Sequence, residues 1–323
     1  MQTCLAFPPV TAPTTRDASA RRASRGAAPA GPSRGTAGDA VPGSVLALDI
    51  ETVPDARLMP ADWPEDRFPK NAWHRIVAIS FVTADILPGL DGRESYAVSD
   101  CRSGGEPGWD EARLLAAFWR FFDAGRYRVV TWNGRAFDMP TILARSMMHG
   151  IDAAAWFRRG TKWEGYGHRF AADWHTDLMD AMSGHGASSR MTLEEAAVTL
   201  GLPGKLGEHG SHVAGLVSAG EIDRVRAYCE TDCINLFALY LRWAHLTGRT
   251  DVDAHDRAIL GLTDFLDLRR GTRPHLGRFL DAWRLSADGA VTIGARRAAA
   301  GPPAVVHGTS PMTRQPTPGE VSG

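Results

Sequence analysis

The chain has 323 residues, of which 44% are hydrophobic and 23% are charged, and its net charge is −1. These values are typical of an ordinary soluble globular protein, and no stretch approaches the roughly 18 consecutive apolar residues that a membrane span requires. The four cysteines do not form a disulfide framework. We therefore expect a reducing compartment, namely the cytoplasm, and no association with a membrane.

Residues 1–43 open the chain with a segment rich in Ala, Pro, Gly, Ser, Thr and Arg. This segment has almost no large apolar residue after Phe7 and cannot bury enough surface to offset the entropy lost on ordering, so we predict a disordered tail. A transit peptide and a wrongly assigned start codon are the alternatives. Residues 287–323 have a similar composition and carry the same prediction.

Strands and helices alternate between these tails. In chain order the predicted elements are strands at 45–50, 74–83 and 94–98, a helix at 110–122, a strand at 128–132, a helix at 140–148, a strand at 175–178, and helices at 192–200 and 221–246. This order predicts an α/β domain over residues 44–247. A Rossmann fold would need Gly-x-Gly-x-x-Gly after the first strand, where residues 51–54 read ETVP.

Residues 248–286 form a predicted C-terminal helical annex with two helical runs. Ile259, Leu262, Phe265 and Leu266 make an apolar stripe along the first run, which predicts that the annex packs on the preceding domain. A small separate unit for interactions is the alternative.

Five residues in three places carry the chemistry. Asp49 and Glu51 end the first predicted strand on one face, because side chains alternate with period two. Asp138 follows the strand at 128–132, and Tyr228 and Asp232 share one face of the last helix at positions i and i+4. Four carboxylates that converge without a basic partner would repel one another, and hard divalent cations such as Mg²⁺ and Mn²⁺ relieve that repulsion. The pattern predicts two-metal phosphoryl chemistry.

Each of these residues also has an ordinary structural interpretation when it is taken alone. Asp138 precedes a helical run and would serve as its N-cap. Asp49 would face water at a strand end, and Glu51 would be exposed in a turn. Tyr228 would be a packing residue, and Asp232 a solvated one. One hypothesis explains all five residues, whereas these interpretations must hold independently.

The three fragments, DIE at 49–51, NGRAFD at 133–138 and YCETD at 228–232, resemble the motifs of the DEDD superfamily of 3′→5′ exonucleases. With tyrosine rather than histidine at position 228, the third motif resembles that of the DEDDy branch. The surrounding sequence over about 44–247 resembles predicted PolB-like exonucleases. The resemblance implies a ribonuclease H-like mixed sheet, an antiparallel meander plus parallel strands flanked by helices. It also implies two Mg²⁺ or Mn²⁺ ions and a substrate with a single-stranded 3′ end, preferably DNA. An RNA exonuclease and a non-catalytic ribonuclease H-like scaffold for nucleic acid or protein are the alternatives.

The same resemblance assigns roles to the site residues. It implies that Asp49 is shared by both ions, that Glu51 and Asp232 complete the site of the attacking water, and that Asp138 serves the leaving group. Tyr228 would orient the attacking water, since a tyrosine with an ordinary pKa near 10 is a poor general base at pH 7.

Substrate contacts are predicted mainly in residues 156–170, where cationic and aromatic residues are interleaved. Cations meet phosphates and aromatic faces stack on bases, which suits a single strand. The candidates in this loop are Arg158, Arg159, Lys162, Trp163, Tyr166 and Arg169. An ordinary surface loop is the alternative.

Three further residues are substrate-binding candidates. Lys205 lies in a GLPGK segment that resembles a loop near the substrate in the family. Asn133 would hold the turn before Asp138. Phe137 would pack against the terminal base or cap the core.

Overall fold

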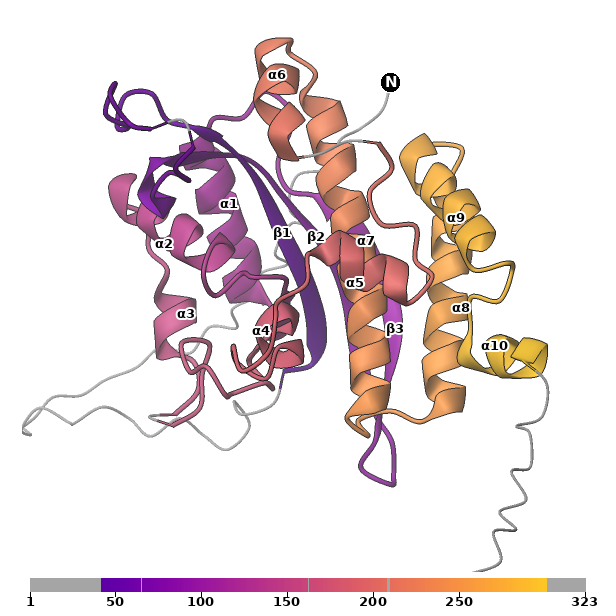
Figure 1. Cartoon of the computed structure of the whole chain (residues 1–323). Helices are drawn as coiled ribbons and strands as arrows, with labels where there is room; N and C mark the ends of the chain where they lie inside the picture. The colour runs from indigo at the N-terminus through magenta and orange to yellow at the C-terminus, as the bar shows by residue number, and fades with distance from the viewer. Residues whose placement is uncertain (1–41, 65, 162, 208–209, 301–323) are drawn as a thin grey trace, which may run out of the picture.

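The structure is a computed structural model, and it describes residues 42–64, 66–161, 163–207 and 210–300. A mixed five-stranded sheet lies at its centre (Figure 1). The strands are β1 (Ser44–Pro54), β2 (His74–Pro88), β3 (Glu94–Ser103), β4 (Tyr127–Thr131) and β5 (His175–Asp177). Their order is β3-β2-β1-β4-β5. β1, β2 and β3 form an antiparallel meander, whereas β4 and β5 run parallel to β1. This confirms the predicted α/β class and the ribonuclease H-like mixed sheet.

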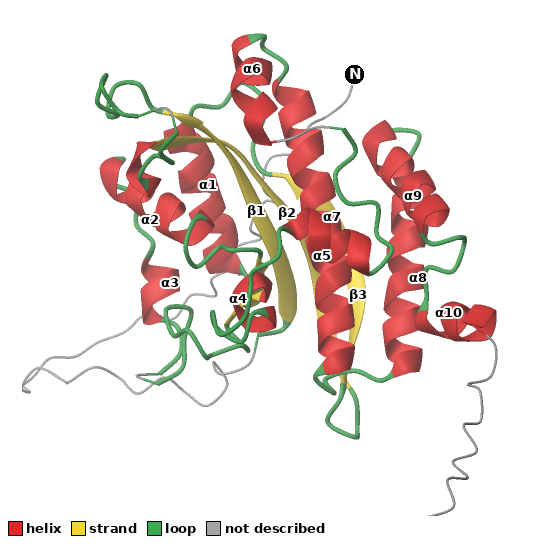
Figure 2. Cartoon of the chain, in the orientation of Figure 1, coloured by secondary structure: helices red, strands yellow, loops and turns green. Residues whose placement is uncertain are grey.

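Helices cover both faces of the sheet (Figure 2). They are α1 (Glu111–Ala124), α2 (Asp138–Met148), α3 (Ala154–Arg158), α4 (Leu178–Met182), α5 (Leu193–Thr199), α6 (Val213–Ser218), α7 (Ile222–Leu246), α8 (Val252–Arg269), α9 (Pro274–Ser286) and α10 (Ile293–Ala300), with 3₁₀ turns η2 (Asn71–Trp73) and η3 (Gly210–His212). In the described part of the chain no helix is long and apolar enough to cross a membrane.

The alternation of side chains along β1 separates two hydrophobic cores. Leu46 and Leu48 pack with the side chains of α1 and α2 on one face. Val45 and Ala47 point to the other face, where α7 and α8 lie. Figure 1 shows this division, with α1 and α2 on one side of β1 and α7 on the other. β1 is therefore buried on both faces, as its continuous apolar run predicts.

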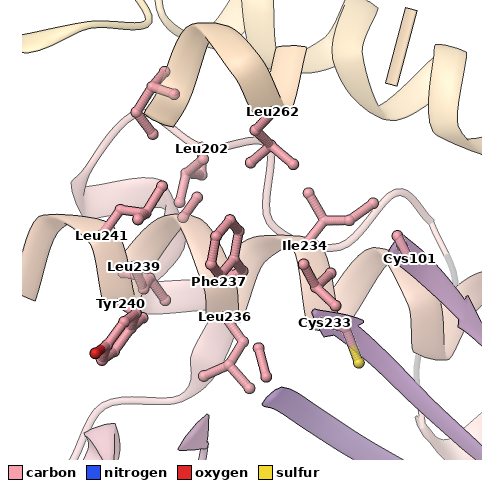
Figure 3. Packing of buried hydrophobic residues seen from close by; sticks show 14 of the residues in the cluster. Cys101, Leu202, Cys233, Ile234, Leu236, Phe237, Leu239, Tyr240, Leu241 and Leu262 are labelled. Carbon is pink, nitrogen blue, oxygen red and sulfur yellow. The ribbon is translucent and has the colours of Figure 1, made fainter. Parts of the chain in front are cut away.

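The C-terminal helices share the core of α7, so the prediction that they pack on the domain is confirmed. Leu262 of α8 and Phe279 of α9 are fully buried in one cluster with Phe237 of α7. Figure 3 shows Leu262 and Leu202 beside Phe237 in this cluster. The predicted boundary at residue 247 therefore does not separate two hydrophobic cores.

A buried ionic cluster joins α7 to the start of α9. Glu230 of α7 accepts hydrogen bonds from the Ser103 backbone amide at 2.7 Å and from the Ser103 hydroxyl at 2.9 Å. Its other oxygen pairs with Arg273 and with His275 Nε2, the latter at 2.6 Å. Arg273 also donates to the Cys101 carbonyl of β3. These contacts fix the orientation of α7 relative to the sheet.

Several predicted boundaries differ from the structure. β3 extends to Ser103 rather than ending at residue 98, since its pairing with β2 continues along the longer strand. The predicted tail at 287–323 is wrong in its first part, because α10 occupies Ile293–Ala300. The side chain of Asp256 in α8 accepts hydrogen bonds from the first two backbone amides of α10, which stabilises the start of α10. Residues 1–41 and 301–323, which the tail predictions also cover, lie outside the described residues.

Candidate active site

β1 brings Asp49 and Glu51 to the face of the sheet that α7 covers. Val45 and Ala47 define this face, and the period of two continues it through residues 49 and 51. Glu51 is buried and Asp49 is partly buried. The interpretation of Glu51 as an exposed turn residue is wrong, because β1 continues past it. The register of β1 against β2 shifts directly after Glu51, and bulges of this kind redirect strands beside active sites.

Helix α7 brings Tyr228 and Asp232 to the same place. The two residues are one turn apart, and both are buried. Cys229 lies between helix and strand, with its thiol 3.4 Å from Asp49 Oδ2. Asp232 lies close enough to β1 for its charge to raise the pKa of both Asp49 and Glu51.

Asp138 enters the site as the first residue of α2. The preceding turn is tight, with a φ of 63° at Asn133, and Asn tolerates this left-handed conformation better than most residues. Asp177 holds the turn, since it accepts the backbone amides of Asn133 and Arg135, both at 3.0 Å. The N-cap position of α2 belongs to Phe137, so the interpretation of Asp138 as an N-cap is wrong.

The four carboxylates lie close enough to perturb one another. Burial raises the pKa of Asp49 well above its ordinary value, and the charges of the other three carboxylates raise it further. Burial likewise raises the pKa of Glu51, with the charge of Asp232 as the next cause. Burial raises the pKa of Asp138 to about 7 and that of Asp232 to about 6. The ionised cluster is therefore unfavourable at neutral pH without a cation.

Lys205 places one positive charge beside this cluster. Its charge lowers the pKa of Glu51 and Asp232, although burial outweighs this effect in both. Its Nζ lies 5.4 Å from the centroid of the Tyr228 ring, which is a cation–π distance. One ammonium group cannot balance four carboxylates, so the cluster keeps a deficit of positive charge.

Tyr228 interacts with Lys205 through its ring and with Asp232 through its hydroxyl. Burial raises the pKa of Tyr228 above its ordinary value, and the charges of Asp232, Glu51 and Asp49 raise it further. A hydrogen bond from the Tyr228 hydroxyl lowers the pKa of Asp232. The phenol therefore keeps its proton at neutral pH and acts as a hydrogen-bond donor.

The donor atoms of the cluster fit a divalent cation. Ligand atoms of Asp49, Glu51 and Cys229 lie within 4.8 Å of one another. Asp232 Oδ1 is buried and has no hydrogen-bond partner among the described residues. A buried carboxylate oxygen without a partner is costly, and an oxygen-rich set of ligands is what Mg²⁺ and Mn²⁺ prefer.

The loop at 156–170 is mostly a structural element. Tyr166 is buried, stacks on Trp156 at 4.8 Å and donates to the Tyr127 carbonyl, so the expectation that it stacks on a base is wrong. Arg159 donates to the carbonyls of Phe122 and Gly125 at the end of α1. These contacts support the alternative of an ordinary surface loop for this part of the segment.

The remaining candidates in this loop differ in exposure. Arg169 pairs with Asp180 through two hydrogen bonds, at 2.8 and 2.6 Å. Arg158 is exposed, and Trp163 is 77% exposed. Lys162 lies outside the described residues. Arg158 and Trp163 thus stay predictions.

An aromatic group beside Asp138 was not predicted as a whole. The Phe137 ring lies 5.1 Å from His74 and 5.7 Å from Phe68, measured between ring centroids. Phe68 is 70% exposed. Asn71 donates to the carbonyls of Ala136 and Phe137 and so ties the β1–β2 connection to the start of α2. Phe68 and Asn71 gave no sequence signal, because the 55–73 segment has no periodic pattern.

Arg145 is a further residue that sequence reasoning missed. It is fully buried on α2 and pairs with Glu111 of α1 and with Asp55 directly after β1. It also donates to the Ala72 carbonyl at 3.1 Å. Because α2 carries Asp138 and β1 carries Glu51, these ion pairs fix the helix and the strand, and so the two carboxylates, relative to each other.

The chain is similar to known proteins. A family described as predicted 3′–5′ exonucleases related to the exonuclease domain of PolB matches residues 66–283. The matched stretch begins after β1 and includes Asp138, Tyr228 and Asp232, together with α8 and most of α9. No curated protein matches at a significant level.

Among solved structures, the family B DNA polymerase from the hyperthermophilic archaeon Pyrobaculum calidifontis is similar, with a TM-score of 0.40 and 19% sequence identity. The similarity covers 69% of this chain and 29% of the polymerase, so the chain spans less than a third of that protein. The family match, by contrast, covers more than half of the chain. The chain belongs to the family of predicted 3′–5′ exonucleases related to the exonuclease domain of PolB.

Proposed function

We propose that this protein is a DEDDy-type exonuclease that hydrolyses the terminal phosphodiester bond at the 3′ end of single-stranded DNA with two divalent cations, Mg²⁺ or Mn²⁺. The buried cluster of Asp49, Glu51, Asp138 and Asp232 is the observation that carries this proposal. Burial makes four carboxylates that lie close enough to repel one another costly, and packing alone gives no reason to keep them. Residues 44–247 would carry the chemistry, and the helices of 248–286 would support α7.

The carboxylates would hold the cations. Asp49 and Glu51 would bind from β1, Asp138 from α2 and Asp232 from α7. The bound ions would supply an activated water and stabilise the charge that develops on the leaving 3′ oxygen. Because β1, α2 and α7 are fixed by ion pairs or core packing, the carboxylate ligands are held in place before the substrate arrives.

Tyr228 and Lys205 would act on the substrate side. The raised pKa of Tyr228 keeps its hydroxyl protonated, so it would orient the attacking water rather than deprotonate it. Lys205 would contact the scissile phosphate, since its ammonium group lies beside the ring of Tyr228. The role of Tyr228 therefore requires no change in its protonation at neutral pH.

The single strand would reach the site along the aromatic group of Phe68, His74 and Phe137. Phe68 presents an exposed ring next to the helix that starts with Asp138, and aromatic faces stack on bases without sequence preference. Asn133 would support this entrance as the turn before α2. Arg158 and Trp163 would contact more distant nucleotides. The relation of the family to the exonuclease domain of PolB favours DNA.

A nuclease assay tests the proposal. Purified protein is incubated with single-stranded DNA or RNA labelled at the 5′ or the 3′ end, with Mn²⁺, Mg²⁺ or EDTA. We expect stepwise release of nucleoside monophosphates from the 3′ end of DNA, only with a divalent cation. Cleavage in EDTA, or products shortened from the 5′ end, would contradict the mechanism, and faster digestion of RNA would contradict the choice of DNA.

A pair of substitutions localises the activity. Asp49→Asn removes a ligand from the centre of the cluster and should abolish turnover without unfolding the protein. Asp85→Asn changes an exposed carboxylate of β2 and is the matched control, with full activity expected. An Asp49→Asn protein of near-native rate would show that the site is misassigned.

A further inference from the structure

The segment that carries Lys205 has no regular secondary structure. Gly201 and Gly204 on either side of Leu202 have left-handed φ values of 72° and 64°. Within the part of the chain that the structure describes, one hydrogen bond from outside reaches the backbone of residues 203–207. It runs from Asn235 Nδ2 of α7 to the carbonyl of Gly204, at 3.0 Å.

Helix α5 confines the same point from the other side. A Cβ atom on Gly204 would lie 3.2 Å from Val198 Cγ2 and 3.3 Å from Glu194 Cγ. These distances are tight, and the left-handed φ independently disfavours any other residue. The Gly204 carbonyl is therefore held between α5 and the Asn235 amide, directly before Lys205 in the chain.

Asn235 is an unexpected residue at its position on α7. Its side chain is 1% exposed, and its neighbours Ile234 and Leu236 belong to the hydrophobic core. Burying an amide is unfavourable unless it forms hydrogen bonds, and Asn235 Oδ1 has no partner among the described residues. The bond to the Gly204 carbonyl is thus the contact that accounts for an amide here.

We infer that Asn235 is a positioning residue, which fixes the Lys205 ammonium group beside the carboxylates by holding the Gly204 carbonyl. Asn235 follows Asp232 by three residues on α7, and Tyr228 lies on the same helix. One rigid helix therefore sets the positions of a carboxylate, of the tyrosine and of the lysine. The catalytic consequence of this positioning rests on the proposed function, whereas the positioning itself does not.

NMR of methylated lysines tests the positioning without an activity assay. The chain has three lysines, Lys70, Lys162 and Lys205, so reductive methylation with ¹³C-formaldehyde gives few lysine signals. The Lys205 signal, assigned by its loss in Lys205→Met, should be displaced by the ring current of Tyr228. In Asn235→Leu, which keeps the size of the side chain and removes the donor, this displacement should disappear.

Two further variants make the result unambiguous. Gly204→Ala attacks the same hydrogen bond from the loop and should give the same loss if Asn235→Leu does not fold. Tyr240→Phe removes one buried hydrogen-bonding hydroxyl farther along α7, where it accepts from Arg128 at 2.8 Å. This control should leave the Lys205 signal displaced. An unchanged Lys205 signal in folded Asn235→Leu would overturn the inference.

Kinetics then test the coupling. Asn235→Leu should lower kcat/KM by about tenfold, the effect of losing one hydrogen bond. In the Lys205→Met background the same substitution should cause no further loss, because Asn235 acts through Lys205. If Asn235→Leu lowered kcat/KM by the same factor in the Lys205→Met background as in the wild type, this coupling would be overturned. A wild-type protein without nuclease activity would contradict the proposed function but leave the NMR result valid.

Discussion

The charge of Asp138 should make the metal-free protein less stable as pH rises. Burial raises the pKa of this carboxyl from its ordinary value of 3.8 to about 7. At about 1.4 kcal/mol for each pH unit, the difference corresponds to a destabilisation of about 4 kcal/mol when the group is ionised in both states. Asp138→Asn removes the charge and keeps the shape, so it should relieve this cost while it removes a metal ligand.

The direction of the effect follows from proton linkage. In the folded state Asp138 keeps its proton up to a higher pH than in the unfolded state, so the unfolded state binds fewer protons between pH 4 and 7. Stability therefore falls as pH rises through this window. The penalty should be about 2 kcal/mol at pH 5 and about 4 kcal/mol at pH 8.

Urea unfolding of both proteins in EDTA, at pH 5 and pH 8, measures this difference. The free energy of unfolding of Asp138→Asn, relative to that of the wild type, should be higher at pH 8 than at pH 5. Mn²⁺ should stabilise only the wild type. Asp85→Asn is the control, because this exposed carboxylate of β2 lies away from the cluster and its loss should change the stability little at both pH values. A difference between Asp138→Asn and wild type that does not change with pH would refute the reasoning.

Three other substitutions probe separate parts of the site. Tyr228→Phe should lower kcat by about 10²-fold with KM nearly constant, in single-turnover digestion, if the hydroxyl acts mainly in the transition state; a wild-type rate would make it a packing residue. Arg145→Met should cost about 3–5 kcal/mol in urea unfolding, because it removes a fully buried guanidinium from its ion pairs with Glu111 and Asp55, while Arg57→Met, at the exposed partner of Asp55, should cost little. Phe68→Ala should weaken binding of single-stranded DNA by about 1–3 kcal/mol in a fluorescence titration, and a larger loss in Trp163→Ala would place the substrate on the 156–170 loop instead.

Four of the five catalytic candidates could be placed from the sequence because their positions depend on local geometry. Alternation along a buried strand places Asp49 and Glu51 on one face, and a spacing of four on a helix places Tyr228 and Asp232 together. The strand order follows from a meander and then strand–helix alternation. Asp138 needed the resemblance to the exonuclease family, since its own sequence context equally suits an N-cap.

The substrate contacts were harder to predict because charge and aromaticity in a loop do not reveal burial. Tyr166 and Arg159 have the residue types of a nucleic-acid surface, yet one is a core ring and the other binds carbonyls at the end of a helix. Arg145 and Asn235 show the opposite case, because nothing in their local sequence marked them, yet their contacts hold parts of the site in place. Their roles depend on partners 90 and 31 residues away in the chain, and no local pattern encodes such distances.

The arrangement of ion pairs explains how the protein tolerates a repulsive site. The carboxylates lie on β1, α2 and α7. Their mutual repulsion would push these three elements apart if no other contacts held them together. Arg145 ties α2 to the end of β1, and the Glu230 cluster ties α7 to β3 and α9, with both clusters made of well-paired buried charges. Paired buried charges add little net stability, but breaking one pair is costly. The clusters therefore resist displacement of the elements, and this keeps the four carboxylates close together even when no cation offsets their repulsion.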